Sequence, residues 1–162
     1  MAKVQVGINV KLFLMRHGEA SMQAPSDIQR PLTKKGVAQT ESLLDRYTKD
    51  FSSIKTIYAS PYLRAQQTAQ IVSDALGLPI STMTSITPDG DPRRVCDSLF
   101  ESTNNIGDVI LITHMPFVGS LNSLLTSGDS SYSEPFMTSQ VVMLEADQVL
   151  PGCMSKEKIL IP

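Results

Sequence analysis

Histidine and arginine side chains suited to phosphate chemistry directly follow two short apolar runs. The run Leu12–Met15 leads into Arg16 and His17, and the run Val109–Ile112 leads, one residue later, into His114. These are the only two histidines of the chain. An imidazole nitrogen is a nucleophile for phosphorus, and the guanidinium fork matches the oxygens of a phosphoryl group. The pattern therefore favours phosphoryl binding or transfer.

Two further arginines are candidates for the same site. Arg64 lies about one turn into a helix that we expect to begin at Ser60 and Pro61. Helical side chains tilt toward the helix N-terminus, where free N–H groups also favour an anion. Arg30, in the loop after the first apolar run, is a third arginine that we expect to bind phosphate.

The apolar runs are typical of buried parallel strands, because both faces of such strands are covered. In an open α/β sheet, ligands bind at the carboxyl ends of the strands. We therefore expect His17, Arg64 and His114 to converge on one sheet edge, with the histidine side chains within about 10 Å of each other.

Strands and helices alternate along the whole chain. The predicted strands cover residues 12–15, 54–59, 78–83, 109–112, 137–144 and 158–161. The predicted helices cover residues 33–50, 60–76, a segment from 91 onward, and 116–125. Repeated β-α-β units predict a three-layer α/β/α sandwich with a mainly parallel central sheet, formed as a single domain by residues 1–162.

Capping residues delimit these helices. Thr33, Ser60 and Asp91 are predicted N-caps, and Gly77 is predicted to end the second helix. The third helix is expected to bury the apolar residues Val95, Cys96, Leu99 and Phe100.

Composition excludes several classes of function. The chain has 162 residues, with 14 basic and 16 acidic side chains, and shows no basic stripe for nucleic acid or an anionic membrane surface. Residues 1–15 lack a signal-peptide pattern, so we expect a cytoplasmic protein. Cys96 and Cys153 are isolated, and we expect reduced thiols. Residues 1–10 suggest no function.

Each candidate residue taken alone is more typical of a structural role, and a histidine pair also suits a metal. However, converging arginines would repel a divalent cation. We therefore expect no metal and no cofactor, and phosphate or sulfate as the ligand of the site.

The segments that carry these residues form an ordered set. They read RHGEA at 16–20, DIQRPLT at 27–33 with Gly36, SPYLRAQQT at 60–68 and THMPFVG at 113–119. Over residues 11–145 the chain resembles the histidine phosphatase superfamily, with its phosphoglycerate-mutase-like fold, and most of all the SixA-type phosphohistidine phosphatases.

This resemblance implies a mechanism. His17 would attack phosphorus and form a phosphohistidine intermediate that water hydrolyses. Arg16, Arg64, His114 and Arg30 would hold the phosphoryl group, without a metal. Glu19 and Asp27 are both candidate proton donors, and the sequence does not decide between them.

The chain departs from many superfamily members in one respect, because residues 77–91 leave no room for the insertion that supplies an acid and a lid. The imidazole of a phosphohistidine leaves phosphorus more readily than an alcohol does, so its departure depends less on such an acid. We therefore expect the substrate to be a phosphohistidine-bearing protein, such as a helical phosphotransfer (HPt-like) domain or a phosphocarrier, which makes transient contact with this chain. We expect the chain itself to be a monomer. A small-molecule phosphomonoesterase, a mutase and a non-catalytic phosphate-binding module are the alternatives.

Overall fold

A single six-stranded sheet forms the centre of the molecule. The computed structural model describes residues 9–162, with residues 103–106 described by their backbone only. The strands are β1 (Val10–Arg16), β2 (Ile54–Ala59), β3 (Ile80–Thr82), β4 (Asp108–Thr113), β5 (Val141–Ala146) and β6 (Ser155–Leu160). Their order is β3-β2-β4-β1-β5-β6, in which β1 to β4 are parallel and β5 and β6 pair in antiparallel fashion.

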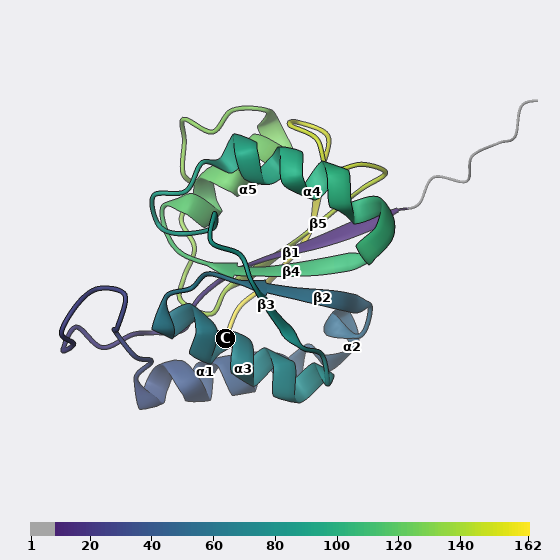
Figure 1. The fold of residues 1–162 in the computed structure, drawn as a ribbon. Helices are drawn as coiled ribbons and strands as arrows, with labels where there is room; N and C mark the ends of the chain where they lie inside the picture. The colour runs from purple at the N-terminus through teal and green to yellow at the C-terminus, as the bar shows by residue number, and fades with distance from the viewer. Residues whose placement is uncertain (1–8) are drawn as a thin grey trace, which may run out of the picture.

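Helices cover both faces of this sheet (Figure 1). They are α1 (Lys34–Arg46), α2 (Thr48–Phe51), α3 (Leu63–Leu76), α4 (Pro92–Ile106) and α5 (Phe117–Ser127). Helices α1 and α3 lie on one side, and α4 and α5 lie on the other (Figure 1). The predicted three-layer α/β/α sandwich with a mainly parallel sheet is confirmed.

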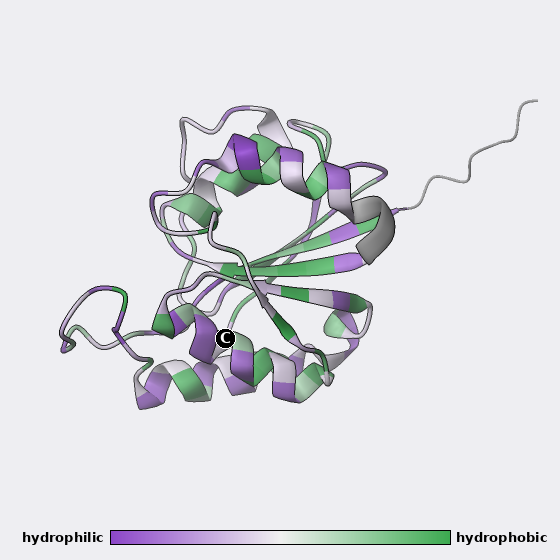
Figure 2. Cartoon of the chain, viewed as in Figure 1, coloured by the Kyte–Doolittle hydropathy of each residue, from purple (hydrophilic) through white to green (hydrophobic). Residues whose placement is uncertain are grey.

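The two cores explain why the first apolar run is continuous. Leu12 and Leu14 pack in the core beneath α4 and α5, whereas Phe13 and Met15 pack in the core beneath α1 and α3. All four side chains are fully buried. The central strands are correspondingly hydrophobic along their length in Figure 2. A strand covered on both faces needs apolar residues at every position, because successive side chains point to opposite faces.

Three of the four predicted caps are present. The Thr33 hydroxyl accepts a hydrogen bond from the Gly36 N–H at 3.0 Å, and the Asp91 carboxylate accepts one from the Arg93 N–H at 2.9 Å. Gly77 ends α3 with a φ of 67°, in the left-handed region. The predicted Ser60 cap is wrong, because α3 begins only at Leu63.

Other predicted boundaries also need correction. The first helix does not run to residue 50, because Tyr47 leaves the helical region at φ −113° and ψ 27°, and α2 follows as a separate turn. Phe100 is 38% exposed, so it does not share the burial of Val95, Cys96 and Leu99 that was predicted for it. The strand predicted from residue 137 begins at Val141, because Met137 and Gln140 are joined in a turn by an N–H···O bond of 3.1 Å.

The register of β1 and β4 places the two histidines side by side. Arg16 pairs with Thr113 in this parallel ladder, and the His17 N–H donates to the Thr113 carbonyl at 2.9 Å. The Ser60 N–H donates to the Ile112 carbonyl at 3.0 Å, which attaches the end of β2 to the same edge. The residues that follow β1, β2 and β4 therefore lie together at one edge of the sheet.

Cys96 is buried, Cys153 is exposed, and both are free thiols, as expected. Within residues 9–162, no helix is long and apolar enough to cross a membrane. The prediction that residues 1–15 are not a signal peptide falls largely on residues 1–8, which lie outside the described residues.

Candidate active site

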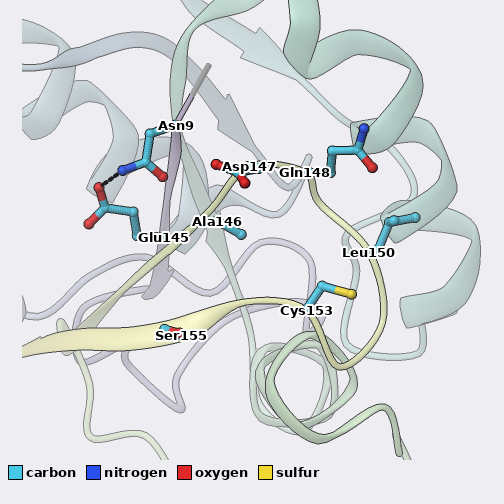
Figure 3. Close-up of a pocket in the computed structure, with 8 residues that line it drawn as sticks. All are labelled: Asn9, Glu145, Ala146, Asp147, Gln148, Leu150, Cys153 and Ser155. Atoms are coloured by element: carbon cyan, nitrogen blue, oxygen red, sulfur yellow. Dashed lines mark hydrogen bonds between the residues drawn. The ribbon is translucent and has the colours of Figure 1, made fainter. Parts of the chain in front are cut away.

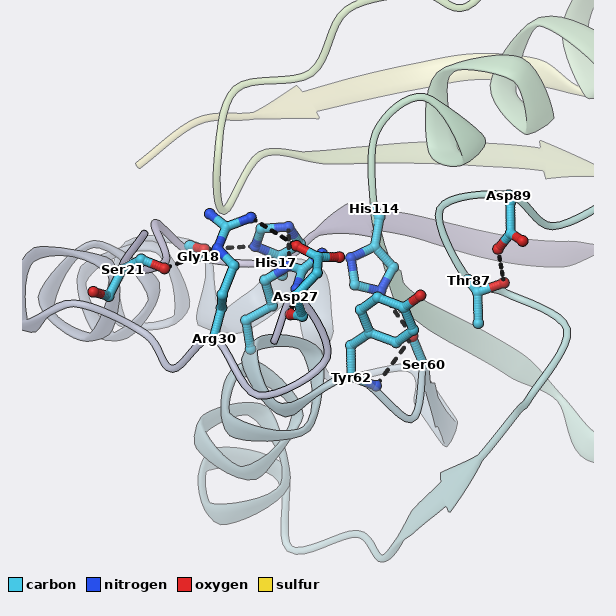
Figure 4. Close-up of polar contacts among 11 residues, drawn as sticks. His17, Gly18, Ser21, Asp27, Arg30, Ser60, Tyr62, Thr87, Asp89 and His114 are labelled. Atoms are coloured by element: carbon cyan, nitrogen blue, oxygen red, sulfur yellow. Dashed lines mark hydrogen bonds and ion pairs between the residues drawn. The ribbon is translucent and has the colours of Figure 1, made fainter. Parts of the chain in front are cut away.

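His17, Arg64 and His114 meet at the carboxyl ends of β1, β2 and β4. The rings of His17 and His114 have centroids 5.0 Å apart, and the Nε of Arg64 lies 3.2 Å from the Nε2 of His17. Figure 4 shows the two histidines facing the same space. All three side chains are largely buried, with exposed fractions of 7%, 4% and 1% for His17, Arg64 and His114.

The partners of His17 fix where its proton lies. Its Nδ1 is 2.6 Å from the carbonyl oxygen of Gly18, which only accepts, so Nδ1 carries the hydrogen. Arg64 donates its Nε–H to Nε2, which must therefore present a lone pair. Burial and the charges of Arg64, Arg16 and Arg30 lower the pKa of His17 to about 4, although the Gly18 contact opposes them. The ring is neutral at pH 7, and Nε2 is its unprotonated nitrogen.

His114 is held by residues at the end of β2. Its Nε2 lies 2.7 Å from the hydroxyl of Ser60, and the Tyr62 ring packs edge-on against it at 4.9 Å. Its Nδ1 is buried and has no hydrogen-bond partner among the described residues. Burial and the charges of His17, Arg64 and Arg16 lower the pKa of His114 to about 3, with Asp27 acting in the opposite direction.

Arg64 reaches the site from the first turn of α3 and connects it to the loop after β1. Its two terminal nitrogens donate to Asp27, one to the backbone carbonyl at 2.6 Å and one to the carboxylate at 3.2 Å. The guanidinium also lies 4.9 Å from the centre of the Tyr62 ring. The hydrogen bonds to Asp27 and His17, together with the Tyr62 ring, hold Arg64 in one orientation.

Arg16 and Arg30 approach the site differently. Arg16 donates to the Phe136 carbonyl at 2.6 Å, while its Nε is buried and has no hydrogen-bond partner within the described chain. Burial and the charge of Arg64 lower the pKa of Arg16. Arg30 donates to the Ser21 carbonyl at 2.8 Å and to the Asp27 carboxylate at 3.1 Å. Arg30 thus joins the cluster through Asp27.

The structure separates the two candidate acids. Glu19 accepts from the Thr33 hydroxyl at 2.9 Å and pairs with Lys35 at 3.1 Å, at the start of α1. Asp27 instead bridges Arg30 and Arg64. Figure 4 shows Asp27 beside the two histidines. Hydrogen bonds from both arginines hold the pKa of Asp27 below its ordinary value. Asp27 is therefore an ionised carboxylate of the site.

Sequence reasoning missed the contacts of Ser60 and Tyr62 with His114. Its interpretation of Ser60 as a helix cap assigned the hydroxyl to the backbone of α3. The available signal was the position of Ser60 directly after β2, at the strand end where site residues gather.

A cavity of about 560 Å³ lies at the opposite end of β1 from the histidine cluster (Figure 3). It is lined by Asn9, Glu145, Ala146, Asp147, Gln148, Leu150, Cys153 and Ser155. None of the predicted site residues lines it.

The fold and the cluster of histidines and arginines agree with comparisons to known proteins. Residues 12–87 match the model of the histidine phosphatase superfamily (branch 1). The chain belongs to the histidine phosphatase superfamily.

Its relatives include proteins named for phosphohistidine. Phosphohistidine phosphatase SixA of Escherichia coli (strain K12) is 34% identical over 142 residues, which are 86% of this chain and 87% of that protein. A SixA homolog of Haemophilus influenzae is 33% identical and covers 69% of this chain and 74% of its own length. A solved structure of the protein histidine phosphatase SixA complexed with tungstate has a TM-score of 0.84 and 32% identity, over 94% of this chain and 97% of that one.

Proposed function

We propose that this protein is a phosphohistidine phosphatase that hydrolyses the phosphoryl group from a histidine of another protein. The observation that carries the proposal is the His17 ring, whose Nε2 lone pair faces Arg64 while Gly18 keeps the proton on Nδ1. A neutral imidazole with one fixed tautomer is a nucleophile ready for phosphorus. The similarity to SixA, which is named for this activity, supports the proposal.

The atoms around His17 suit a phosphoryl group as ligand. The Nε of Arg16 and the Nδ1 of His114 are buried polar atoms without a partner in the described chain. Leaving such groups unpaired is costly, and phosphoryl oxygens would accept from both. Tungstate, the ligand of the SixA structure, is a tetrahedral oxyanion like phosphate. The phosphoryl group would be held by Arg16, Arg64 and His114. Arg30, which pairs with Asp27, would add positive charge to the site.

The first half of the reaction transfers the phosphoryl group to His17. Nε2 of His17 forms a bond to phosphorus as the P–N bond of the substrate breaks. The electron pair of that bond stays on the departing nitrogen, and the substrate ring, protonated on its second nitrogen, leaves as neutral imidazole. The Gly18 carbonyl, 2.6 Å from Nδ1, stabilises the positive charge that develops on His17.

The second half regenerates the free enzyme. A water oxygen attacks phosphorus, the P–Nε2 bond breaks with its electrons on Nε2, and one water proton passes to solvent. His17 keeps its Nδ1 proton throughout. The arginines stabilise the charge of the phosphoryl oxygens in both transition states.

The surface beside the site suits a protein substrate. Ile28 and Leu63 are 53% and 37% exposed, and the Leu63 N–H donates to the Ile28 carbonyl at 2.9 Å, so the two residues are neighbours. They adjoin Asp27 and Arg64 in sequence. Exposed apolar side chains next to an anion site fit the face of a helix that carries the phosphohistidine. We therefore propose a helical phosphotransfer domain or a phosphocarrier as the transient partner.

The experiment compares phosphate release from such a phosphorylated domain with release from a panel of small phosphomonoesters. We expect the higher kcat/KM for the protein substrate, and at least about a thousandfold loss in His17→Ala because no other group replaces the nucleophile. Rapid alkaline quenching followed by mass spectrometry should detect phosphate on the peptide containing His17.

The control is Ser52→Ala, which removes an exposed hydroxyl bonded to the Lys49 carbonyl and should keep wild-type activity. A higher kcat/KM for any phosphomonoester would indicate a small-molecule phosphatase. Phosphate binding without turnover of any substrate would indicate a binding module.

A further inference from the structure

We propose that Ser60 is a positioning residue that keeps the proton of neutral His114 on Nδ1, the ring nitrogen that faces the site. This inference rests on the proposed function, because it assigns the bond that His114 offers to a phosphoryl oxygen.

The backbone holds the Ser60 hydroxyl in a fixed place. Ser60 is fully buried, and its N–H donates to the Ile112 carbonyl at 3.0 Å, across the junction of β2 and β4. Its own carbonyl accepts from the Gln66 side chain at 2.8 Å. These bonds, one on each side of the residue, place the hydroxyl 2.7 Å from the Nε2 of His114.

The direction of the Ser60–His114 hydrogen bond follows from the other partner of the hydroxyl. The Ser60 oxygen accepts from the Tyr62 N–H at 3.4 Å, which uses a lone pair and leaves the hydroxyl proton free. The acceptor within reach of that proton is the Nε2 of His114, 2.7 Å away. Ser60 therefore donates, Nε2 is unprotonated, and a neutral His114 carries its hydrogen on Nδ1.

The His114 ring is neutral under ordinary conditions. It is 1% exposed, and the guanidinium groups of Arg64 and Arg16 oppose a further positive charge, so its pKa falls to about 3. Asp27 is the group that acts in the opposite direction. A neutral ring has one N–H, and the choice of tautomer decides which nitrogen is the donor.

The tautomer matters because of what Nδ1 faces. Figure 4 shows the two ring nitrogens of His114 pointing in different directions, one to Ser60 and the other toward the side of His17 and Asp27. The latter nitrogen is the buried Nδ1 without a partner in the described chain. With hydrogen on Nδ1, it donates to a phosphoryl oxygen; with hydrogen on Nε2, it would turn a lone pair toward that oxygen.

The direct test is the tautomer of His114, measured by long-range ¹⁵N–¹H NMR at pH 7. We expect a protonated Nδ1 in the wild type and a shift toward protonated Nε2 in Ser60→Ala. Ser60→Thr, which keeps the hydroxyl, should restore the wild-type tautomer. The matched control is Ser73→Ala, which removes another hydrogen-bonded hydroxyl, 2.6 Å from the Leu78 carbonyl at the far end of α3.

The kinetic test uses the same variants. We expect Ser60→Ala to lower kcat/KM for a phosphohistidine protein by about tenfold, the value of one hydrogen bond, and to weaken the binding of inorganic phosphate. Ser73→Ala should change neither quantity.

Protonated Nε2 in the wild type, or an unchanged tautomer in Ser60→Ala, would overturn the inference. If the tautomer changes and phosphate binding weakens while no variant hydrolyses phosphohistidine, the role of Ser60 stands and the proposed function fails.

Discussion

Arg64 donates its Nε–H to the Nε2 of His17 across 3.2 Å, so the arginine occupies the lone pair of the proposed nucleophile. This bond orients the imidazole. In the proposed reaction the bond exchanges when substrate arrives, because the same guanidinium then donates to the phosphoryl oxygens. The pair would thus link the orientation of His17 to the binding of the anion.

The first prediction concerns Arg64. Arg64→Ala should lower kcat/KM by about a hundredfold to a thousandfold, the cost of one transition-state donor. It should also raise the pKa of His17, since the Arg64 charge lowers it. Arg64→Lys should restore little activity, because an ammonium lacks the planar fork. The measurement is steady-state kinetics of the Arg64 variants. The control is Arg46→Ala, because Arg46 lies on the surface and donates to the Ile161 carbonyl at 3.3 Å. Full activity in Arg64→Ala would refute the prediction.

The second prediction is the titration of the two histidines. NMR signals of the His17 and His114 rings should move with midpoints near pH 4 and pH 3, below the ordinary value of 6.5. The chain has two histidines, so His17→Asn leaves a single signal and assigns both. A midpoint near 6.5 for His17 would mean that its ring is not held neutral by burial and the arginines.

The third prediction concerns stability at low pH. The unfolded chain takes up protons on both histidines near pH 6.5, whereas the folded chain does so only near pH 4 and pH 3. The unfolding free energy should therefore fall as the pH drops from 6.5 to 4, by up to about 1.4 kcal/mol per pH unit for each histidine. Urea unfolding should show a shallower fall for the double variant His17→Asn, His114→Asn. Equal slopes would contradict the prediction.

The fourth prediction concerns Asp27, whose carboxylate binds the guanidinium groups of Arg30 and Arg64. Bound phosphate would need the same donors and would meet the carboxylate charge. Asp27→Ala keeps the backbone carbonyl that contacts Arg64 and should bind inorganic phosphate several-fold more tightly, as measured by calorimetry. Glu19→Ala is the control, because Glu19 contacts Thr33 and Lys35. Weaker phosphate binding in Asp27→Ala would show that the carboxylate supports the site.

The fifth prediction concerns Gly36, where a Cβ would lie 2.2 Å from the Glu19 carbonyl oxygen. Gly36→Ala must push the loop that follows His17 away from α1. We expect a loss of about 1–3 kcal/mol in unfolding free energy and a loss of activity. Gly77→Ala, at φ 67° in open space, should lose stability without loss of kcat/KM. Unchanged activity in Gly36→Ala would show that the loop tolerates the shift.

The sequence predicted the fold because the strongest signals are local. The runs that became β1 and β4 are apolar at every position, which suits strands buried on both faces. Boundaries were less predictable where tertiary contacts decide them. Ser60 has the residue type of a helix cap, yet His114, distant in sequence, takes its hydroxyl.

The same limit applies to the candidate site. Strand ends predicted that His17 and His114 would be neighbours, because parallel register carries one residue beside the other. The sequence left open whether Glu19 or Asp27 is the proton donor, and it did not show which of them lies beside the histidines. That choice depends on how the loop after β1 folds back against α3, where the Leu63 N–H meets the Ile28 carbonyl.

The pairing of β1 with β4 has a consequence for how the protein matures. His17 belongs to an early segment of the chain, but its neighbour follows β4, and β1 completes its other edge with β5. A nascent chain on the ribosome therefore holds no assembled site until β4 has emerged and inserted between β1 and β2. The proposed phosphoryl binding would therefore begin late in synthesis, and a chain truncated before β4 carries His17 without His114.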